Sequence, residues 1–114
     1  MSDSTVVEDL DKPGEARLGT TRGNTWVRTI EIDRDLTGYE FVGALTGNGI
    51  EPVPLTLEVD AIDTDAPLTT LLARLTAQQT QALRPGVYRH HLSWIDPQEA
   101  VFCFLSGPFE IRER

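Results

Sequence analysis

Apolar and polar residues alternate at every second position along most of this chain. In the stretch 25–33, Trp26, Ile30 and Ile32 fall on one face of an extended backbone. A period of two is typical of a strand with one buried face, whereas an amphipathic helix needs a period of 3.6. The pattern returns at 39–46, 53–60, 71–75, 88–94 and 101–111. Most of the chain is therefore expected to form β-strands.

One short segment departs from this pattern. Residues 76–83 (TAQQTQAL) predict a helix of about two turns, because Thr76 can cap its first turn and Gln79 stands where a capping box requires it. Pro85 ends the helix, since the residue before a proline is disfavoured in the α conformation.

Turn-forming residues separate the strands at 35–38 (DLTG), 47–49 (GNG) and 96–99 (DPQE). Short strands at intervals of roughly 8–14 residues predict an all-β fold, an antiparallel Ig-like β-sandwich of about seven strands with one short helix before the penultimate strand. A small closed barrel has the same periodicity and is the alternative.

Residues 1–21 differ from the remainder, since they are acidic and show little periodicity. We expect an N-terminal arm or disordered tail over 1–21 and the sandwich domain over 22–114. As an arm, the segment would order on a neighbouring subunit, with Val6, Val7 and Leu10 as its anchors.

Size and charge exclude several classes of partner. The 114 residues fit one domain, and their net charge is −8 with a single Lys. Nucleic acid and anionic membranes are therefore poor partners, because both require a basic surface. No apolar stretch is long enough to cross a bilayer, the acidic N-terminus is unlike a secretory signal, and one Cys cannot form an internal disulfide. The chain is expected to fold in a cytoplasm.

The YRHH sequence at 88–91 raises the question of a site. Tyr88 follows the helix and a Pro-Gly turn, which suits a tyrosine corner bonding back to the preceding loop. His90 and His91 are adjacent on a strand, so their side chains point to opposite faces and cannot converge on a metal. The stretch is interpreted as scaffold.

Catalytic and cofactor motifs are not apparent in the sequence. Cys103 lies among apolar residues, where an inert buried thiol is expected. No Ser lies in a GxSxG elbow, and the GNG loop lacks the GK[ST] of a phosphate loop. The chain is expected to be no enzyme and to bind no cofactor or metal.

The stretch VFCFL at 101–105 is apolar on both faces. Either this strand is covered on both sides within the domain, or Phe102 and Phe104 form a contact patch for another chain.

Four segments together resemble a known family: Arg22–Trp26 (RGNTW), Asp35–Tyr39 (DLTGY), Leu75–Tyr88 (LTAQQTQALRPGVY) and Phe104–Ile111 (FLSGPFEI). The chain is similar to small tailed-bacteriophage virion proteins whose Ig-like sandwich is like the N-terminal domain of baseplate upper proteins. Asn24 stands where the family usually has Asp, and the acidic extension before residue 20 is a further departure.

The resemblance implies a structural protein of the virion, assembled in the host cytoplasm. We expect a tail or baseplate component, or an adaptor joining the tail to fibre or receptor-binding proteins, acting as a homo-oligomer. A capsid decoration protein bound to the major capsid protein is an alternative. A carbohydrate-binding module using Trp26, Trp94, Tyr39 and Tyr88 is another, although the alternation directs both Trp to the core.

Overall fold

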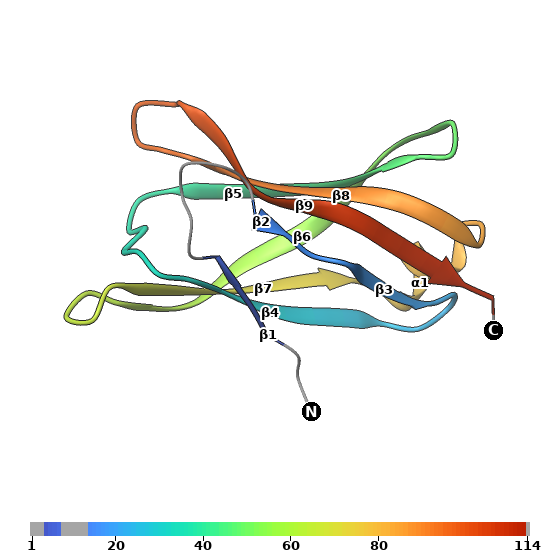
Figure 1. Ribbon diagram of the computed structural model, residues 1–114, viewed down its shortest axis with the longest axis horizontal. Helices are drawn as coiled ribbons and strands as arrows, with labels where there is room; N and C mark the ends of the chain where they lie inside the picture. The colour runs from blue at the N-terminus through green and yellow to red at the C-terminus, as the bar shows by residue number, and fades with distance from the viewer. Residues whose placement is uncertain (1–3, 8–13, 114) are drawn as a thin grey trace.

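The computed structural model describes residues 4–7 and 14–113 and arranges them as two stacked layers of strands (Figure 1). The predicted all-β fold, with one short helix before the penultimate strand, is confirmed. In the described residues, the elements are β1 (Ser4–Val7), β2 (Gly14–Glu15), β3 (Leu18–Thr21), β4 (Trp26–Ile32), β5 (Glu40–Gly47), β6 (Ile50–Asp63), β7 (Leu68–Leu75), α1 (Ala77–Gln81), β8 (Gly86–Ile95) and β9 (Val101–Arg112).

The long strand β6 joins the two layers. Its first half pairs with β5, in the layer that also holds β8 and β9, and its second half pairs with β7, in the layer of β4 and β1 (Figure 1). A register shift between Val59 and Ala61 interrupts its pairing with β7. The hydrogen-bonded path runs from β1 to β2 without closing among the described strands, so they form one open sheet that β6 carries from one layer to the other.

The core lies between the layers and follows the predicted alternation. Trp26, Ile30 and Ile32 of β4 are buried, and the neighbouring strand β7 adds the buried Leu71, Ala73 and Leu75. The layer of β8 and β9 contributes the other large buried rings and aliphatic side chains: Tyr88, Leu92, Trp94, Phe104, Leu105, Phe109 and Ile111.

The domain begins earlier than the boundary expected at residue 22. Strands β2 and β3 pair in parallel with β9, and Leu18 is only 5% exposed within the core. Strands of two and four residues are too short to produce a visible alternation, and their partner lies about ninety residues along the chain, so no local pattern announced them.

Part of the expected arm also pairs within its own chain. Strand β1 lies parallel to β4, with Val6 opposite Glu31 and Val7 opposite Ile32. Leu10, the third predicted anchor, lies outside the described residues. The backbone at Val6 and Val7 therefore extends this chain's own sheet.

Gly107 allows the N-terminal segment to lie against β9. A Cβ atom at this position would lie 2.3 Å from the Ala16 carbonyl oxygen, and the Gly107 φ of 151° is one that other residues rarely adopt. Beside it, the Ala16 N–H donates to the Ser106 carbonyl at 3.1 Å. The close approach of the two backbones therefore requires glycine.

Replacing this glycine tests the contact. Gly107→Ala should lower the free energy of unfolding by about 3 kcal/mol, because the new methyl group displaces the Ala16 backbone in addition to straining φ. Gly49→Ala is the matched control: Gly49 also has a positive φ, of 71°, but a Cβ there meets nothing within 4 Å. It should cost only about 1 kcal/mol. Urea denaturation measures both, and equal losses would contradict the role of the Ala16 contact.

Candidate functional site

Segments far apart in the sequence interlock at the end of the sandwich that holds α1. The Thr80 hydroxyl donates to the Asn24 carbonyl at 2.8 Å and accepts from the Gly23 N–H at 3.1 Å. Arg22 Nε donates to the Gln81 carbonyl at 3.0 Å. Helix α1 therefore holds the turn that precedes β4 in place by hydrogen bonds.

The predicted capping box at the start of α1 is confirmed. The Thr76 hydroxyl accepts from the Gln79 N–H at 3.1 Å, and the Gln79 side-chain oxygen accepts from the Thr76 N–H at 2.8 Å. These bonds satisfy two backbone N–H groups that have no acceptor within a five-residue helix. Thr76 and Gln79 therefore have a structural role at the start of α1.

The DLTG segment performs the turn role that its composition predicted. Asp35 accepts from both the N–H and the hydroxyl of Thr37, and these bonds lower the pKa of its carboxyl below the ordinary value. The buried Thr69 hydroxyl accepts from the Leu36 N–H at 3.0 Å and donates to the Arg34 carbonyl at 2.8 Å. The loop between β4 and β5 is fixed to β7 by these bonds.

The tyrosine corner predicted at Tyr88 is confirmed. Its hydroxyl donates to the Arg84 carbonyl at 2.8 Å, four residues upstream, while its ring is buried. The bond connects the loop after α1 to the beginning of β8. Tyr88 is therefore a structural residue.

His90 and His91 point to opposite faces, as predicted. His90 is fully buried, and neither of its ring nitrogens has a hydrogen-bond partner among the described residues. His91 is half-buried on the outer face, where its Nε2 lies 3.3 Å from the Thr46 hydroxyl. The two rings share no ligand position.

Burial lowers the pKa of His90 to about 4. The next cause is the charge of His91, with a smaller contribution in the same direction from Arg89, while the backbone of Pro108 and Gly107 offsets part of the shift. The folded chain consequently holds a neutral imidazole in its core at neutral pH.

Phe104 is not part of a surface patch, which corrects that part of the contact hypothesis. It is fully buried and stacks on Trp94, with ring centroids 5.3 Å apart. A register shift in the β8–β9 ladder pairs Ser93 with Cys103 but Leu92 with Leu105, so Phe104 is the extra residue of a bulge and turns inward beside Leu105. The bulge interrupts the alternation of faces, so the consecutive side chains of Phe104 and Leu105 both point into the core.

Phe102 is half-buried and packs against the same indole, with ring centroids 4.9 Å apart. Tyr39 meets Trp94 edge-on at 6.1 Å, and the Arg34 guanidinium lies 5.9 Å above the ring. At the other end, Trp26 packs edge-on against Phe109. Both Trp and Tyr88 are buried, so these aromatic side chains do not form an exposed platform for sugar rings.

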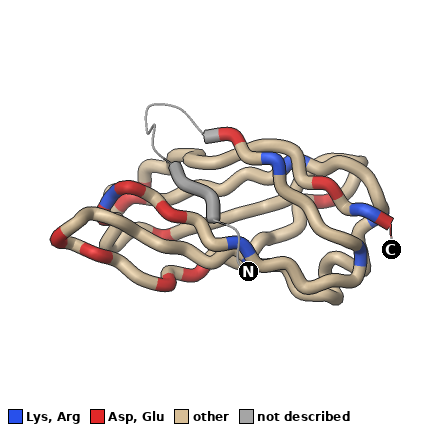
Figure 2. Tube along the Cα trace, turned by 60° about the horizontal axis from the view of Figure 1, so that its bottom comes forward, with Lys and Arg blue, Asp and Glu red and all other residues tan. Residues whose placement is uncertain are grey.

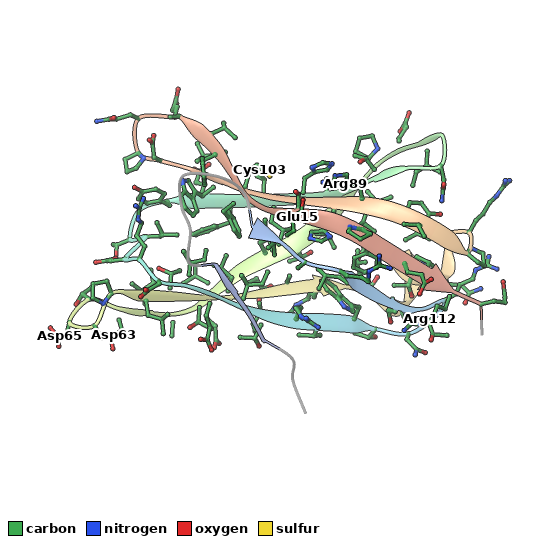
Figure 3. All side chains as sticks on the ribbon, in the orientation of Figure 1. Glu15, Asp63, Asp65, Arg89, Cys103 and Arg112 are labelled. Atoms are coloured by element: carbon green, nitrogen blue, oxygen red, sulfur yellow. The ribbon has the colours of Figure 1, made fainter. Side chains whose placement is uncertain are left out.

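The outer face of the β5–β8–β9 layer carries apolar side chains that sequence analysis did not single out. Val42 is 49% exposed and Val101 is 66% exposed. Ile95 pairs with Val101, while Val42 lies opposite Ser93, two residues before Ile95 on β8. Cys103 lies on the same face, labelled in Figure 3. The sequence contained a signal for this apolar face, because valine stands at outward positions where a polar residue is usual.

A hollow of about 610 Å³ lies next to this apolar face, beside the β8–β9 hairpin. Glu40, Asp96 and Glu99 contribute to its lining together with Ile95 and Val101. In the described residues, no group of three or more His, Cys, Asp or Glu is arranged to hold a metal ion. The described helix is too short to span a bilayer. The arrangement of this face suits contact with another protein.

Comparisons with known proteins identify no family for this chain. No family model and no curated protein matches it. One similar solved structure is PbICP-C in complex with falcipain-2, at 11% identity and a TM-score of 0.47, covering 99% of this chain and 100% of that chain. Another is an internalin-like protein of Listeria monocytogenes, at 13% identity and a TM-score of 0.41, with 98% of this chain and 30% of that chain covered. Similarities this weak carry no argument about function.

Removing the Tyr88 hydroxyl tests the corner. Tyr88→Phe should reduce the free energy of unfolding by about 1–2 kcal/mol, because the Arg84 carbonyl loses its donor. Tyr39→Phe is the control, since the Tyr39 hydroxyl has no hydrogen-bond partner among the described residues and its ring contact is kept. Thermal and urea denaturation measure the difference, and equal stability of both variants would argue against the corner.

Buried His90 should make stability depend on pH. Its contribution is fully present above the unfolded pKa of about 6.5 and is lost as pH falls toward the folded value of about 4, because only the unfolded chain takes up the proton in this interval. From pH 7 to about pH 5, this group should remove about 2 kcal/mol of unfolding free energy.

The comparison that isolates this effect uses two variants. His90→Leu should remove that part of the pH dependence, whereas His91→Gln, on the opposite face, should keep most of it. Urea denaturation at both pH values measures each chain. A His90→Leu variant with an unchanged pH dependence would show that the carboxylates, and not this imidazole, cause the loss.

Proposed function

We propose that this chain is a non-enzymatic structural protein of a tailed-bacteriophage virion, acting in the tail or baseplate as an adaptor to fibre or receptor-binding proteins. Its partners are other virion proteins and further copies of itself, and it is assembled in the host cytoplasm. The proposal begins from the four segments that resemble such proteins.

The observation that carries the proposal is the interlocking of those segments. The Arg22–Asn24 turn bonds to α1 through Thr80, and the Leu75–Tyr88 segment closes with the Tyr88 corner. Residues in two of these segments therefore act together on one scaffold. Motif residues that contact one another support a common structural role in the sandwich more strongly than separate motifs do.

A rigid sandwich with exposed apolar side chains suits an adaptor. The backbone loops at both ends are tied by side-chain bonds, and the Val42, Ile95 and Val101 face offers a contact surface instead of the Phe102 and Phe104 patch. Contact surfaces of this kind commonly combine an apolar centre with a polar rim, which Glu40 and Glu99 supply here.

The tail is placed ahead of the head because the resembling proteins have a sandwich like that of baseplate upper proteins. Residues 14–15 and 18–21 pair with β9 of their own domain, so this stretch is not a free arm in either assignment.

Immunogold electron microscopy tests the proposal. Antibody raised against this chain should label the tail tip of phage particles purified from the bacterial culture that produces them. Particles from which the gene has been deleted, where they still assemble, are the control for antibody specificity. Gold over the head would overturn the tail assignment in favour of decoration. Absence of label, with the epitope detected after the particles are unfolded, would overturn a place in the virion.

A further inference from the structure

Exposed valines gather on the outer face of the β5–β8–β9 layer. Val42 and Val101 lie there with Val87, which is 58% exposed, and the alternation of each strand directs all three outward. Exposed apolar side chains scattered singly are ordinary on a monomer, whereas several on one sheet face are typical of a contact surface. This face therefore requires an occupant.

Small side chains form most of the middle of this face. His91 lies beside Ala44 on β5 and Ser106 on β9, and Ser93 lies beside Cys103. Figure 3 labels Cys103 on this layer. Because few side chains stand high over the middle, a second surface can approach the strands closely there.

The twist of the layer gives the face a shape that fits a copy of itself. The β5–β6 and β8–β9 hairpins rise from opposite ends of the layer (Figure 1), and they belong to opposite sides of the strand order β6-β5-β8-β9. Diagonal corners are therefore raised, as in any twisted sheet. When a second copy is turned by half a turn about an axis across the strands, its raised corners lie over the lowered corners of the first.

Charged side chains differ between the two ends of the molecule. Figure 2 shows acidic residues gathered toward the end that carries the β6–β7 hairpin. On the outer face, Glu40 and Glu99 line the hollow at this end, whereas Arg89 lies toward the other end, beside Pro108. Among the described residues, none of these three charged groups forms an ion pair. The face thus has an acidic end and a basic end with charges available to a partner.

We propose that this face binds the same face of a second copy, in a twofold dimer whose β8 strands lie antiparallel. The axis crosses β8 between His91 and Ser93, so the row of side chains through Arg89 in each copy lies over the row through Ile95 in the other. A twofold contact is self-complementary, since every pair of residues occurs twice.

This arrangement accounts for the exposed groups of the face. Arg89 of each copy reaches Glu40 of the other, because Glu40 lies beside Ile95 in the same row. Val101 packs on Pro108 of the second copy, since these residues occupy the corresponding rows of β9. The acidic end of each copy therefore meets the basic end of the other.

The size of the face is sufficient for a stable dimer. The layers are stacked in the plane of Figure 1, across its horizontal axis, so the outer face extends over the 43 Å and 21 Å axes of the molecule. Specific protein contacts bury about 800 Å² on each partner, which a face of these dimensions can supply.

One carboxylate of the face opposes the contact. Glu15 pairs with Ser106 at the outer edge of β9, so the two Glu15 side chains of the dimer lie on the same side of the axis, in neighbouring rows. Their repulsion acts at the solvated rim, where a Debye length of about 10 Å at 0.1 M salt weakens it. Glu15 and Glu40 consequently have opposite effects on association.

Sedimentation velocity of the full chain tests the dimer. At about 0.1 M NaCl, the chain should pass from monomer to dimer over about a hundredfold range of protein concentration, with no larger species, because a twofold contact closes on itself. A chain that stays monomeric over this range would overturn the inference. Species that grow beyond the dimer would overturn it as well.

Two equally exposed valines locate the apolar contact. Val42→Asp should weaken association at least about tenfold, because a carboxylate would be buried in the contact. Val27→Asp is the matched control: Val27 is 48% exposed, against 49% for Val42, but lies on the outer face of the other layer. Equal weakening by both variants would overturn the assignment of the face.

Charge variants test the direction of the contact. Glu40→Gln should weaken association about threefold, whereas Glu15→Gln should leave it unchanged or strengthen it, although both remove one negative charge. Arg89→Glu should also weaken it, and the double variant with Glu40→Arg should recover it. Equal strengthening by the two Gln variants, or no recovery in the double variant, would overturn the antiparallel pairing. Circular dichroism verifies that each variant is folded.

Cys103 reports on the face without a substitution. Its reaction with a maleimide should slow as the wild-type chain dimerises, because the contact covers the thiol, and should not depend on the concentration of the Val42→Asp variant. A rate that stays constant while the wild-type chain dimerises would place the contact elsewhere and overturn the inference.

The inference rests on the contact surface of the proposed function and names its occupant, yet the two can fail separately. A monomer in solution, with gold at the tail tip, would assign the face to a different virion protein and overturn only the dimer. A dimer in solution, with no gold on accessible particles, would overturn only the place in the virion.

Discussion

The register of β8 against β9 decides which side chains enter the core. Side chains alternate between faces, so a slip by one residue would expose Tyr88, Leu92 and Trp94 and bury the charged Arg89. The tyrosine corner fixes the beginning of β8, and the bulge at Phe104 allows one extra apolar side chain to turn inward without shifting the remainder of the ladder. Gly107 then lets the N-terminal segment pair along the outer edge of β9. Each feature acts on the same ladder.

The extent to which sequence could predict this fold follows from where the information lies. Alternation is local, so it located β4 and β7 and their buried side chains, and the capping residues located α1. Strands β2 and β3 depend on a partner about ninety residues away and are too short to alternate. The Phe104 bulge is a property of the pairing with β8, and its sequence is equally consistent with an exposed aromatic strand. Long-range pairing therefore explains why sequence analysis misplaced both the start of the domain and the side chain of Phe104.

The same distinction applies to the candidate surfaces. Tyr88 and the opposed His90 and His91 could be interpreted correctly because a turn and a strand fix their directions locally. The net charge was known from composition, but composition contains no positions, and Arg17 and Arg112 become neighbours only through the pairing of β3 with β9. The valines of the outer face were visible in the alternation, although a single exposed valine indicates little until neighbouring strands place several together.

The N-terminal segment stabilises the domain through its pairing with β9. Ala16 lies against Gly107, and its N–H donates to the Ser106 carbonyl. Strand β3 continues this pairing and carries Leu18 into the core. A change that detaches the segment from β9 would therefore weaken the core around Leu18 as well as the edge of the sheet.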